Sequence, residues 1–428
     1  MSIGETREFD PTVTEHFDTL ETRDPEVRER ALLARLPIQI AYAKAHAPAF
    51  ARMLDGVNPL DVTSREALAR LPVTRKSDLA AMQAEARPFG GLAATRRGAD
   101  GTRAARVFAS PGPIYEPEGR SPDYYRIARA MFAAGFRAGD LVHNSFAYHL
   151  TPAGALVETG AHALGCTVFP GGTGQTELQV RAMVDLAPDA YAGTPSFLKI
   201  LLEKADEQGV ALTSLKKALV SAEPFPPSLR DAWLARGIAG YQAYATADLG
   251  SIAYETPARE GLVVDEGVLV EIVRPGTGDP VPPGDVGEVV VTSLFNSEYP
   301  LIRFGTGDLS ALLAGVSPCG RTNLRIKGWM GRADQTTKVK GMFVHPGQVA
   351  TIVRRHPEVL KARLVVDNPE GNDRMTLHVE VRDNASSHAE ALVATIRDVT
   401  KLRGEVAFGA PGTLPNDGKV IEDVRRYE

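Results

Sequence analysis

The chain has 428 residues, which is enough for two or three domains and a large core. Apolar residues make up 43% and charged residues 24%, as in ordinary globular proteins, and a formal net charge of -5 without a basic block argues against a nucleic-acid partner. Two cysteines, Cys166 and Cys319, argue against a disulfide framework. We find no signal peptide and no membrane span of roughly 20 apolar residues, so we expect a cytoplasmic protein without membrane contact.

The chain begins with helical patterns. Residues 24 to 55 carry apolar side chains near the helical period. PVTRKSDLAAMQ follows, where Pro72 breaks the preceding segment and either Thr74 or Ser77 can cap a new helix. These segments carry no chemistry by themselves.

Between residues 123 and 240, helical segments alternate with short apolar strands. The expected helices are YYRIARAMFAAGFRAGD, PAGALVETGAHALG, TELQVRAMVDLAP and SFLKILLEKADEQG, and the expected strands are LVHNSFA, CTVFP, AYAGTP, KALVS and GYQAY. This alternation predicts a mainly parallel sheet with helices on both faces. Ligands bind at the carboxyl ends of such strands, where we find Phe146, Tyr148 and His149 after one strand.

Two further strands lead into polar segments. KALVS is followed by Ala222, Glu223 and Pro224. GYQAY delivers Tyr244 and then Asp248, which can bind a hard cation through oxygen or cap a helix.

Residues 252 to 303 alternate apolar and polar positions between glycine and proline turns, which indicates an antiparallel β subdomain. The motif FGTGDL then turns the backbone and exposes Asp308, whose carboxylate can accept two hydrogen bonds from a ribose diol or simply close the turn. Arg332 and Asp334 follow in GRADQ, where a surface ion pair is the alternative reading. Strands and a helix complete the C-terminal part, which ends in PNDGK with Lys419.

The order of these motifs resembles the phenylacetate-CoA ligase family of adenylate-forming enzymes over nearly the whole chain. The resemblance implies an α/β fold with a large N-terminal adenylation domain, residues 1–334, that has βα-alternating sheets and a β subdomain. This domain would hold the acyl and ATP sites and part of the CoA site. Residues 335–428 would form a small mobile α+β domain that carries the catalytic lysine.

The resemblance also implies roles for individual residues. Lys419 would contact the carboxylate and α-phosphate during adenylation, and Asp334 would be the hinge. Lys340 and Gly341 would belong to a loop that swings in toward CoA. The implied nucleotide-binding residues are Ser110, Gly112, Ala222, Glu223, Pro224, Tyr244, Thr246, Asp308 and Arg332. Asp248 would hold Mg²⁺. The candidate acyl pocket consists of Phe146, Tyr148, His149 and Tyr191, although aromatic residues are equally common in cores.

The phosphate-binding loop departs from the family pattern, which is a Ser/Thr/Gly-rich loop ending in lysine. In ASPGPIYEPEG, Pro111 and Pro113 remove backbone donors, and Glu116 and Glu118 bring negative charge. Either the loop still touches ATP through fewer donors or ATP is not used.

A structural zinc occurs in some relatives, held by three cysteines and a histidine. The matching places here hold Thr256, a non-histidine within residues 261–264, Ser317 and Cys319. One thiol cannot make a closed tetrahedral site, so we expect no zinc.

These observations predict an ATP-dependent ligase that converts a carboxylic acid, of aryl or arylacetic type, through acyl-AMP to its CoA thioester, with ATP, Mg²⁺ and coenzyme A. The alternatives are an ATP-independent acyltransferase between CoA and a carrier protein, a non-catalytic binder of nucleotide or acyl-CoA, and an adenylating enzyme with an amine or carrier thiol as acceptor. The sequence does not determine whether the protein forms a homodimer.

Overall fold

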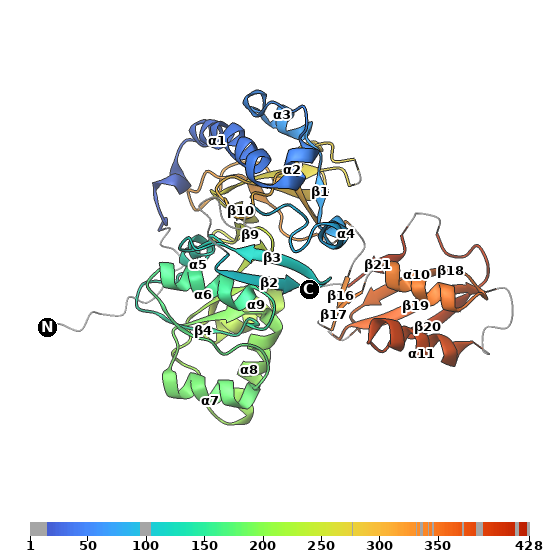
Figure 1. Cartoon of the computed structure of the whole chain (residues 1–428). Helices are drawn as coiled ribbons and strands as arrows, with labels where there is room; N and C mark the ends of the chain where they lie inside the picture. The colour runs from blue at the N-terminus through green and yellow to red at the C-terminus, as the bar shows by residue number, and fades with distance from the viewer. Residues whose placement is uncertain are drawn as a thin grey trace. The chain divides into compact units, whose positions relative to one another are not determined.

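The computed structural model describes residues 15–94, 104–275, 277–330, 332–333, 337–340, 342–344, 346–369, 372–381, 388–415 and 419–425. The chain divides into two compact units, Met1–Met330 and Gly331–Glu428 (Figure 1). The sequence placed a domain boundary after Asp334, which lies outside the described residues.

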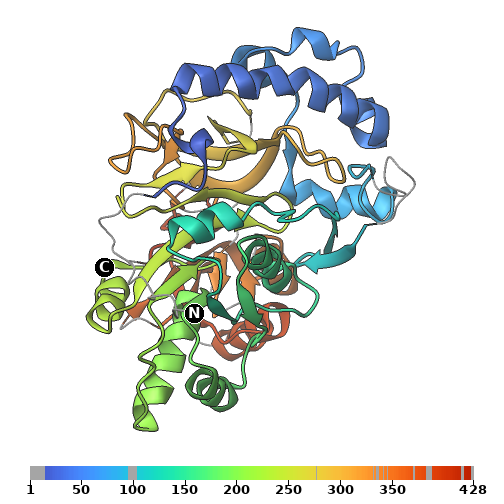
Figure 2. The same ribbon diagram turned by 90° about the vertical axis from the view of Figure 1, so that its left-hand side faces the viewer.

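The N-terminal helices cover a four-stranded sheet. Helix α1 (Pro25–His46) begins at Asp24, whose carboxylate accepts the amides of Glu26 and Val27, and its buried positions recur at helical spacing. They share one hydrophobic core with the sheet, and Figures 1 and 2 show α1 lying over these strands. The sheet has the order β1 (Thr74–Arg75), β13 (Phe304–Ser310), β12 (Gly287–Ser293) and β11 (Val268–Val273). The other helices here are α2 (Pro48–Met53), α3 (Arg65–Ala69) and α4 (Leu79–Glu85).

The segment around Thr74 differs from its predicted role as a helix start. Thr74 and Arg75 form β1, which pairs in parallel with Phe304 and Gly305. Ser77 donates to Asp78, and α4 has no side-chain cap. Lys76 follows directly after β1, the strand that pairs with β13.

A nine-stranded sheet forms the centre of the first unit. Its order is β14 (Leu312–Leu313), β15 (Arg325–Ile326), β10 (Leu262–Val264), β9 (Gly250–Tyr254), β8 (Ala239–Thr246), β7 (Lys217–Val220), β6 (Ala190–Gly193), β4 (Leu141–Asn144) and β5 (Thr167–Phe169). Strands β4 to β8 are parallel, and the strands beyond β8 are antiparallel. The predicted parallel sheet and the antiparallel strands of residues 252–303 are confirmed, but those antiparallel strands are divided between two sheets. Strands β9 and β10 extend the nine-stranded sheet, whereas β11 and β12 belong to the four-stranded sheet.

Helices cover both faces of the parallel strands. On β7, Leu219 enters the core with α5 (Ala128–Ala133) and α6 (Ala153–Ala163). Its neighbours Ala218 and Val220 enter the opposite core with α7 (Thr176–Leu186), α8 (Pro195–Glu207) and α9 (Pro227–Ala235). Because side chains alternate along a strand, one strand supplies both cores.

Helix α5 is shorter than the predicted helix of residues 124–140. The Asp123 carboxylate accepts the amides of Ile127 and Ala128, and Arg126 has a left-handed backbone conformation with φ 60°. An L-residue in that conformation cannot continue a right-handed helix. The helix therefore begins only at Ala128.

The segment predicted as a phosphate loop is a hairpin. Strand β2 (Arg106–Ser110) pairs antiparallel with β3 (Ile114–Glu118), so that Ser110 faces Ile114 across a turn of Pro111, Gly112 and Pro113.

The second unit has its own core. Strands β20 (Glu405–Gly409), β19 (Arg374–Val381), β18 (Val359–Asp367) and β21 (Ile421–Asp423) form a sheet that shares its core with α10 (Pro346–Arg355) and α11 (Ala389–Thr400). Strands β16 (Thr337–Val339) and β17 (Met342–Val344) form a hairpin.

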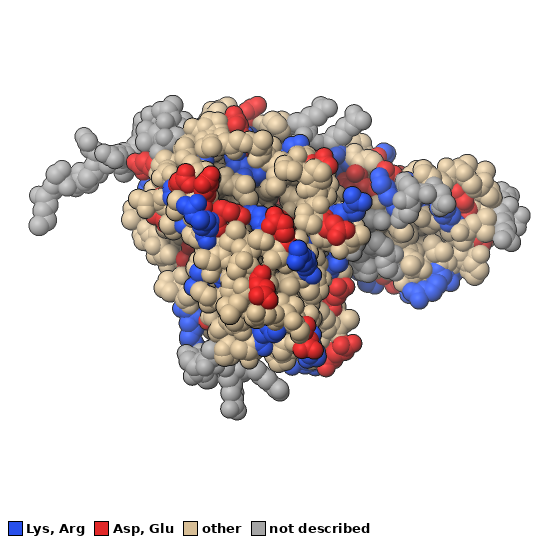
Figure 3. Space-filling model, turned by 90° about the horizontal axis from the view of Figure 1, so that it is seen from above, with Lys and Arg blue, Asp and Glu red and all other residues tan. Residues whose placement is uncertain are grey.

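In the part of the chain that the structure describes, no helix is both long and apolar enough to span a membrane. Basic and acidic side chains are interspersed on the face drawn in Figure 3.

Candidate active site

Asp308 and Tyr244 meet at the junction of the two sheets. Asp308 on β13 is buried, and the Tyr244 hydroxyl on β8 donates to its Oδ2 at 2.9 Å. The Trp329 indole donates to Oδ1 at 3.1 Å, and the Asp308 amide donates to the hydroxyl of Thr306 at 3.1 Å. These bonds orient the carboxylate of Asp308, and its contact with the hydroxyls of a ribose stays a prediction. Sequence reasoning named Asp308 and Tyr244 but missed Trp329.

Glycine shapes the strand that carries Asp308. Gly307 has a positive φ of 76°, and a Cβ at Gly305 would lie 2.7 Å from the Glu288 carboxylate. Both positions therefore favour glycine, which explains the two glycines of the motif.

Asp248, the candidate magnesium ligand, lies in the turn after β8 with its side chain fully buried. Lys76 Nζ lies 2.5 Å from Asp248 Oδ2, and Oδ1 has no hydrogen-bond partner among the described residues. A buried carboxylate oxygen without a partner suits a hard cation, so the residues present fit the expected metal. Sequence reasoning missed Lys76, because one lysine near a strand end carries no pattern.

Thr246 precedes Asp248 on the same turn. Its hydroxyl accepts the amide of Leu249 at 3.2 Å and so holds the turn between β8 and β9. Contact of Thr246 with an α-phosphate stays a prediction.

The donors of Ser110 in the β2–β3 hairpin bond to a carboxylate of the same hairpin. Both the amide and the hydroxyl of Ser110 donate to the carboxylate of Glu116, which is buried. Burial, followed by the negative charge of Asp248, raises the pKa of Glu116 to about 8, whereas Lys76 lowers it. Gly112 sits in the tight turn, where a Cβ would lie 2.8 Å from Ile114. The Ser110 groups expected to face phosphate are therefore engaged by a residue of the same hairpin.

Ala222, Glu223 and Pro224 follow β7 at the carboxyl edge of the parallel strands. Ala222 has a left-handed φ of 69°, and Glu223 accepts the amide of Ser196 at 3.3 Å. This bond ties the segment to the start of α8. Their place beside adenine stays a prediction.

The four candidate acyl-pocket residues do not behave alike. Phe146 and Tyr191 are both buried but belong to different cores, and the Tyr191 hydroxyl donates to the Thr194 carbonyl. Tyr148 is partly buried, with its hydroxyl donating to Glu158 at 2.9 Å, whereas His149 is exposed. A role for these four residues in an acyl pocket stays a prediction.

The remaining predicted residues belong to the second unit. Lys419 has a half-exposed side chain with Nζ 3.4 Å from Glu422 Oε1. Lys340 is exposed, and its amide donates to Asp373 at 2.8 Å. Arg332 is partly buried, while the predicted hinge Asp334 and Gly341 lie outside the described residues.

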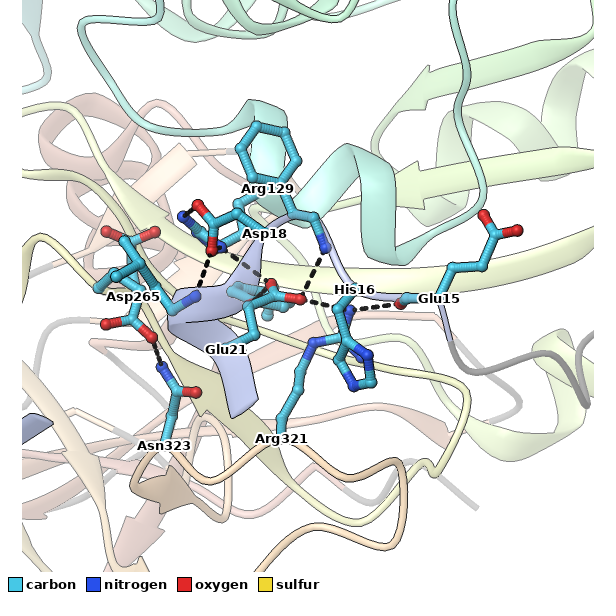
Figure 4. Close-up of polar contacts among 12 residues, drawn as sticks. Glu15, His16, Asp18, Glu21, Arg129, Asp265, Arg321 and Asn323 are labelled. Atoms are coloured by element: carbon cyan, nitrogen blue, oxygen red, sulfur yellow. Dashed lines mark hydrogen bonds and ion pairs between the residues drawn. The ribbon is translucent and has the colours of Figure 1, made fainter. Parts of the chain in front are cut away.

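A buried ion-pair network surrounds Glu21 near the place compared with the zinc site (Figure 4). Its carboxylate lies 2.9 Å from Arg321 and 3.2 Å from Arg129, and it accepts the Tyr254 hydroxyl at 2.7 Å. Nearby, Cys319 Sγ lies 3.1 Å from the Ser317 hydroxyl.

Within the described ranges, no group of three or more His, Cys, Asp or Glu side chains could hold a metal ion. The expectation of no zinc stays a prediction for elemental analysis.

The fold and these motifs define an adenylate-forming enzyme. A family model described as AMP-binding enzyme matches residues 128–297. The phenylacetate-coenzyme A ligase of Thermus thermophilus is 34% identical over 84% of this chain and 83% of its own length, and that of Pseudomonas putida is 31% identical over 86% and 84%. The chain belongs to the phenylacetate-CoA ligase family.

A solved structure is similar over nearly the whole chain. It is 2-hydroxyisobutyryl-CoA ligase in complex with 2-HIB-AMP and CoA, with a TM-score of 0.78, 25% identity and coverage of 98% of this chain and 96% of that chain. Membership of the family makes this protein an ATP-dependent, AMP-forming ligase that joins a carboxylic acid to CoA through acyl-AMP.

Proposed function

We propose that the carboxylic acid is an aryl or arylacetic acid, with phenylacetate as the reference compound. The observation that carries this proposal is the match to curated phenylacetate-CoA ligases over most of both chains. Phe146 and Tyr148 follow β4 at the carboxyl edge of the sheet. Their aromatic rings offer flat apolar surfaces against which a planar acid can pack.

The chain's own residues divide the work of binding and charge stabilisation. Asp308, oriented by Tyr244 and Trp329, accepts the ribose hydroxyls. Lys419 brings a mobile cation to the carboxylate and α-phosphate, where negative charge develops during adenylation. Asp248 holds Mg²⁺, which when bound offsets charge on the phosphates.

The domain roles belong to the same proposal. Residues 1–334 hold the nucleotide and the acid, and residues 335–428 carry Lys419. Rotation at Asp334 after adenylation withdraws Lys419 and brings Lys340 and Gly341 toward CoA.

The test is AMP release from ATP by the purified chain with phenylacetate, benzoate or 2-hydroxyisobutyrate, each with and without CoA. We expect CoA-stimulated AMP release with phenylacetate or benzoate. AMP release with 2-hydroxyisobutyrate but with neither phenylacetate nor benzoate would contradict the proposed acid class.

A further inference from the structure

The turn that carries Asp248 lies against the backbone of Tyr125, a residue from an earlier part of the chain. This turn, residues 247–249, joins β8 to β9. The Tyr125 carbonyl accepts the amide of Ser251 at 2.8 Å. Gly250 has a φ of 72°, and a Cβ at this position would lie 2.5 Å from the Tyr125 carbonyl oxygen, so the close approach requires glycine. The backbone of Tyr125 therefore fixes the place where β9 begins.

The guanidinium of Arg126 joins the same turn to Asp265. Its Nη2 donates to the carbonyl of Leu249 at 2.7 Å and to that of Ser251 at 3.0 Å, and its Nε donates to Asp265 Oδ1 at 3.0 Å. A planar guanidinium has five N–H donors in a fixed arrangement, so it can bind two carbonyls and a carboxylate at once. Leu249 directly follows Asp248, so Arg126 holds the backbone one residue away from the candidate magnesium ligand.

Asp265 is itself held in place. It follows β10, and its side chain is 2% exposed. Its amide donates to the Ile252 carbonyl at 2.9 Å, and its Oδ1 accepts the amide of Gly267 at 2.9 Å. A Cβ at Gly267 would lie 2.5 Å from Cδ of Arg126, so the arginine side chain packs closely against this backbone. The ion pair with Asp265 therefore gives Arg126 a fixed position from which it can hold the turn.

The backbone of Arg126 and the carboxylate of Asp248 both point to a functional role for these contacts. Arg126 has a left-handed φ of 60°, which residues other than glycine seldom adopt. Such strain persists where surrounding contacts enforce it, and it clusters at functional sites. The Asp248 side chain is fully buried, and its Oδ1 has no hydrogen-bond partner within the described ranges. The backbone of the turn therefore determines where this oxygen points.

We propose that Arg126 is a positioning residue for the metal site. By binding the carbonyls of Leu249 and Ser251, it holds Asp248 where the carboxylate can meet the divalent cation that accompanies ATP. Arg126 acts through the turn and does not touch the cation. This inference rests on the proposed magnesium role of Asp248.

The experiment measures Mn²⁺ binding to the full-length chain by electron paramagnetic resonance, with and without α,β-methylene-ATP. We expect Arg126→Met to weaken Mn²⁺ binding by roughly 10–100-fold, as loss of a residue that orients a metal ligand does. Charge alone predicts the opposite sign, because removing a nearby positive charge favours a bound cation. Weaker binding therefore reports the position of Asp248. Unchanged or tighter Mn²⁺ binding in folded Arg126→Met overturns the proposal.

A milder variant, Arg126→Lys, keeps the positive charge but lacks the planar arrangement of donors. It should weaken Mn²⁺ binding by a smaller factor than Arg126→Met. If Arg126→Met does not fold, as judged by circular dichroism, Arg126→Lys decides the proposal: weaker Mn²⁺ binding supports it, and unchanged binding overturns it.

A matched control comes from Arg325 on β15. Its guanidinium binds the Glu260 carboxylate at 3.2 Å and donates to the carbonyls of Ala314 at 3.0 Å and Gly315 at 3.3 Å. Arg325→Met therefore removes a similar set of bonds from a segment that carries no expected metal ligand, and it should leave Mn²⁺ affinity unchanged. Equal weakening in Arg325→Met and Arg126→Met would show general destabilisation and overturn the positioning role.

Adenosine binding, measured by calorimetry without metal, tests whether the effect stays at the turn. Adenosine has the ribose but no phosphate, and Tyr244 and Asp308 lie outside the turn, so Arg126→Met should bind it with unchanged affinity. Equal losses of adenosine and Mn²⁺ binding would give Arg126 a general structural role instead.

Asp248→Asn separates this inference from the proposed function. If Asp248→Asn binds Mn²⁺ as tightly as the unaltered protein, the proposed metal site fails and the inference fails with it. Weaker Mn²⁺ binding in Asp248→Asn together with unchanged binding in Arg126→Met would overturn the role of Arg126 alone.

Discussion

The Tyr244 hydroxyl donates to Asp308 Oδ2 at 2.9 Å, although the two residues are 64 positions apart in the chain. Their strands belong to different sheets, so this bond joins the parallel sheet to the sheet beneath α1. The two residues that the sequence assigned separately to the nucleotide thus form one polar unit.

Asp308→Ala should weaken AMP binding by roughly 10–100-fold, because hydrogen bonds to a charged group contribute about 1.5–3 kcal/mol each. Tyr244→Phe should have a smaller effect, since Trp329 still orients the carboxylate. Isothermal titration with AMP measures both. Asp279→Asn, at an exposed position, is the control. Equal AMP affinity in Asp308→Ala would remove Asp308 from the ribose site.

Lys419→Ala should separate the two half-reactions. Acyl-AMP formation should fall by roughly 10²–10³-fold, since a positioned donor to developing charge is lost. Thioester formation from supplied acyl-AMP and CoA should be spared, because Lys419 acts only in adenylation. Rapid-quench assays of each step make the comparison, with exposed Lys401→Ala of the same unit as the control. Equal loss of both steps would contradict the assigned role.

Glu21→Ala should lower the free energy of unfolding by about 3–5 kcal/mol, because it leaves Arg321 buried without its carboxylate partner, whereas Arg129 keeps its ion pair with Asp18. Glu15→Gln removes a more exposed partner of Arg137 and should cost less than about 1 kcal/mol. Urea denaturation followed by circular dichroism gives both values. Similar decreases in the free energy of unfolding of the two variants would show that burial does not increase the contribution of the Glu21 network to stability.

Asp123 should make stability depend on pH. Burial raises its pKa to about 7, above the usual 3.8, so between these values the folded protein keeps a proton that the unfolded chain loses. Its contribution to stability is complete below about pH 4 and is lost as pH rises toward 7. Relative to the unaltered protein, Asp123→Asn should therefore gain stability with rising pH, by at most about 1.4 kcal/mol per pH unit.

Urea denaturation of the two proteins at several pH values between 4 and 8 tests this sign. Asp55→Asn, at an exposed position, controls for the loss of one charge. A stability difference between Asp123→Asn and the unaltered protein that stays constant, or that falls with pH, would contradict the prediction.

The sequence by itself determined the family, the βα alternation and the positions of Tyr244, Asp248 and Asp308, because each follows from local periodicity or a short motif. The N-terminus of α5 was not predictable from periodicity, since the capping carboxylate of Asp123 and the left-handed Arg126 override the helical pattern.

Only the tertiary structure decided which charges meet. Lys76 pairs with Asp248 across 172 positions, and Glu21 meets Arg321 from the other end of the first unit. No local pattern encodes such pairs, because they arise when separate strands and helices bury polar groups against one another. The hydrogen bonds from Ser110 to Glu116 join residues that are close in the sequence. They nevertheless depend on the register of the hairpin, which the prolines and glutamates of this segment do not predict. The chain's motifs identified the chemistry, and the folded arrangement of its buried charges decided how the phosphate loop is closed.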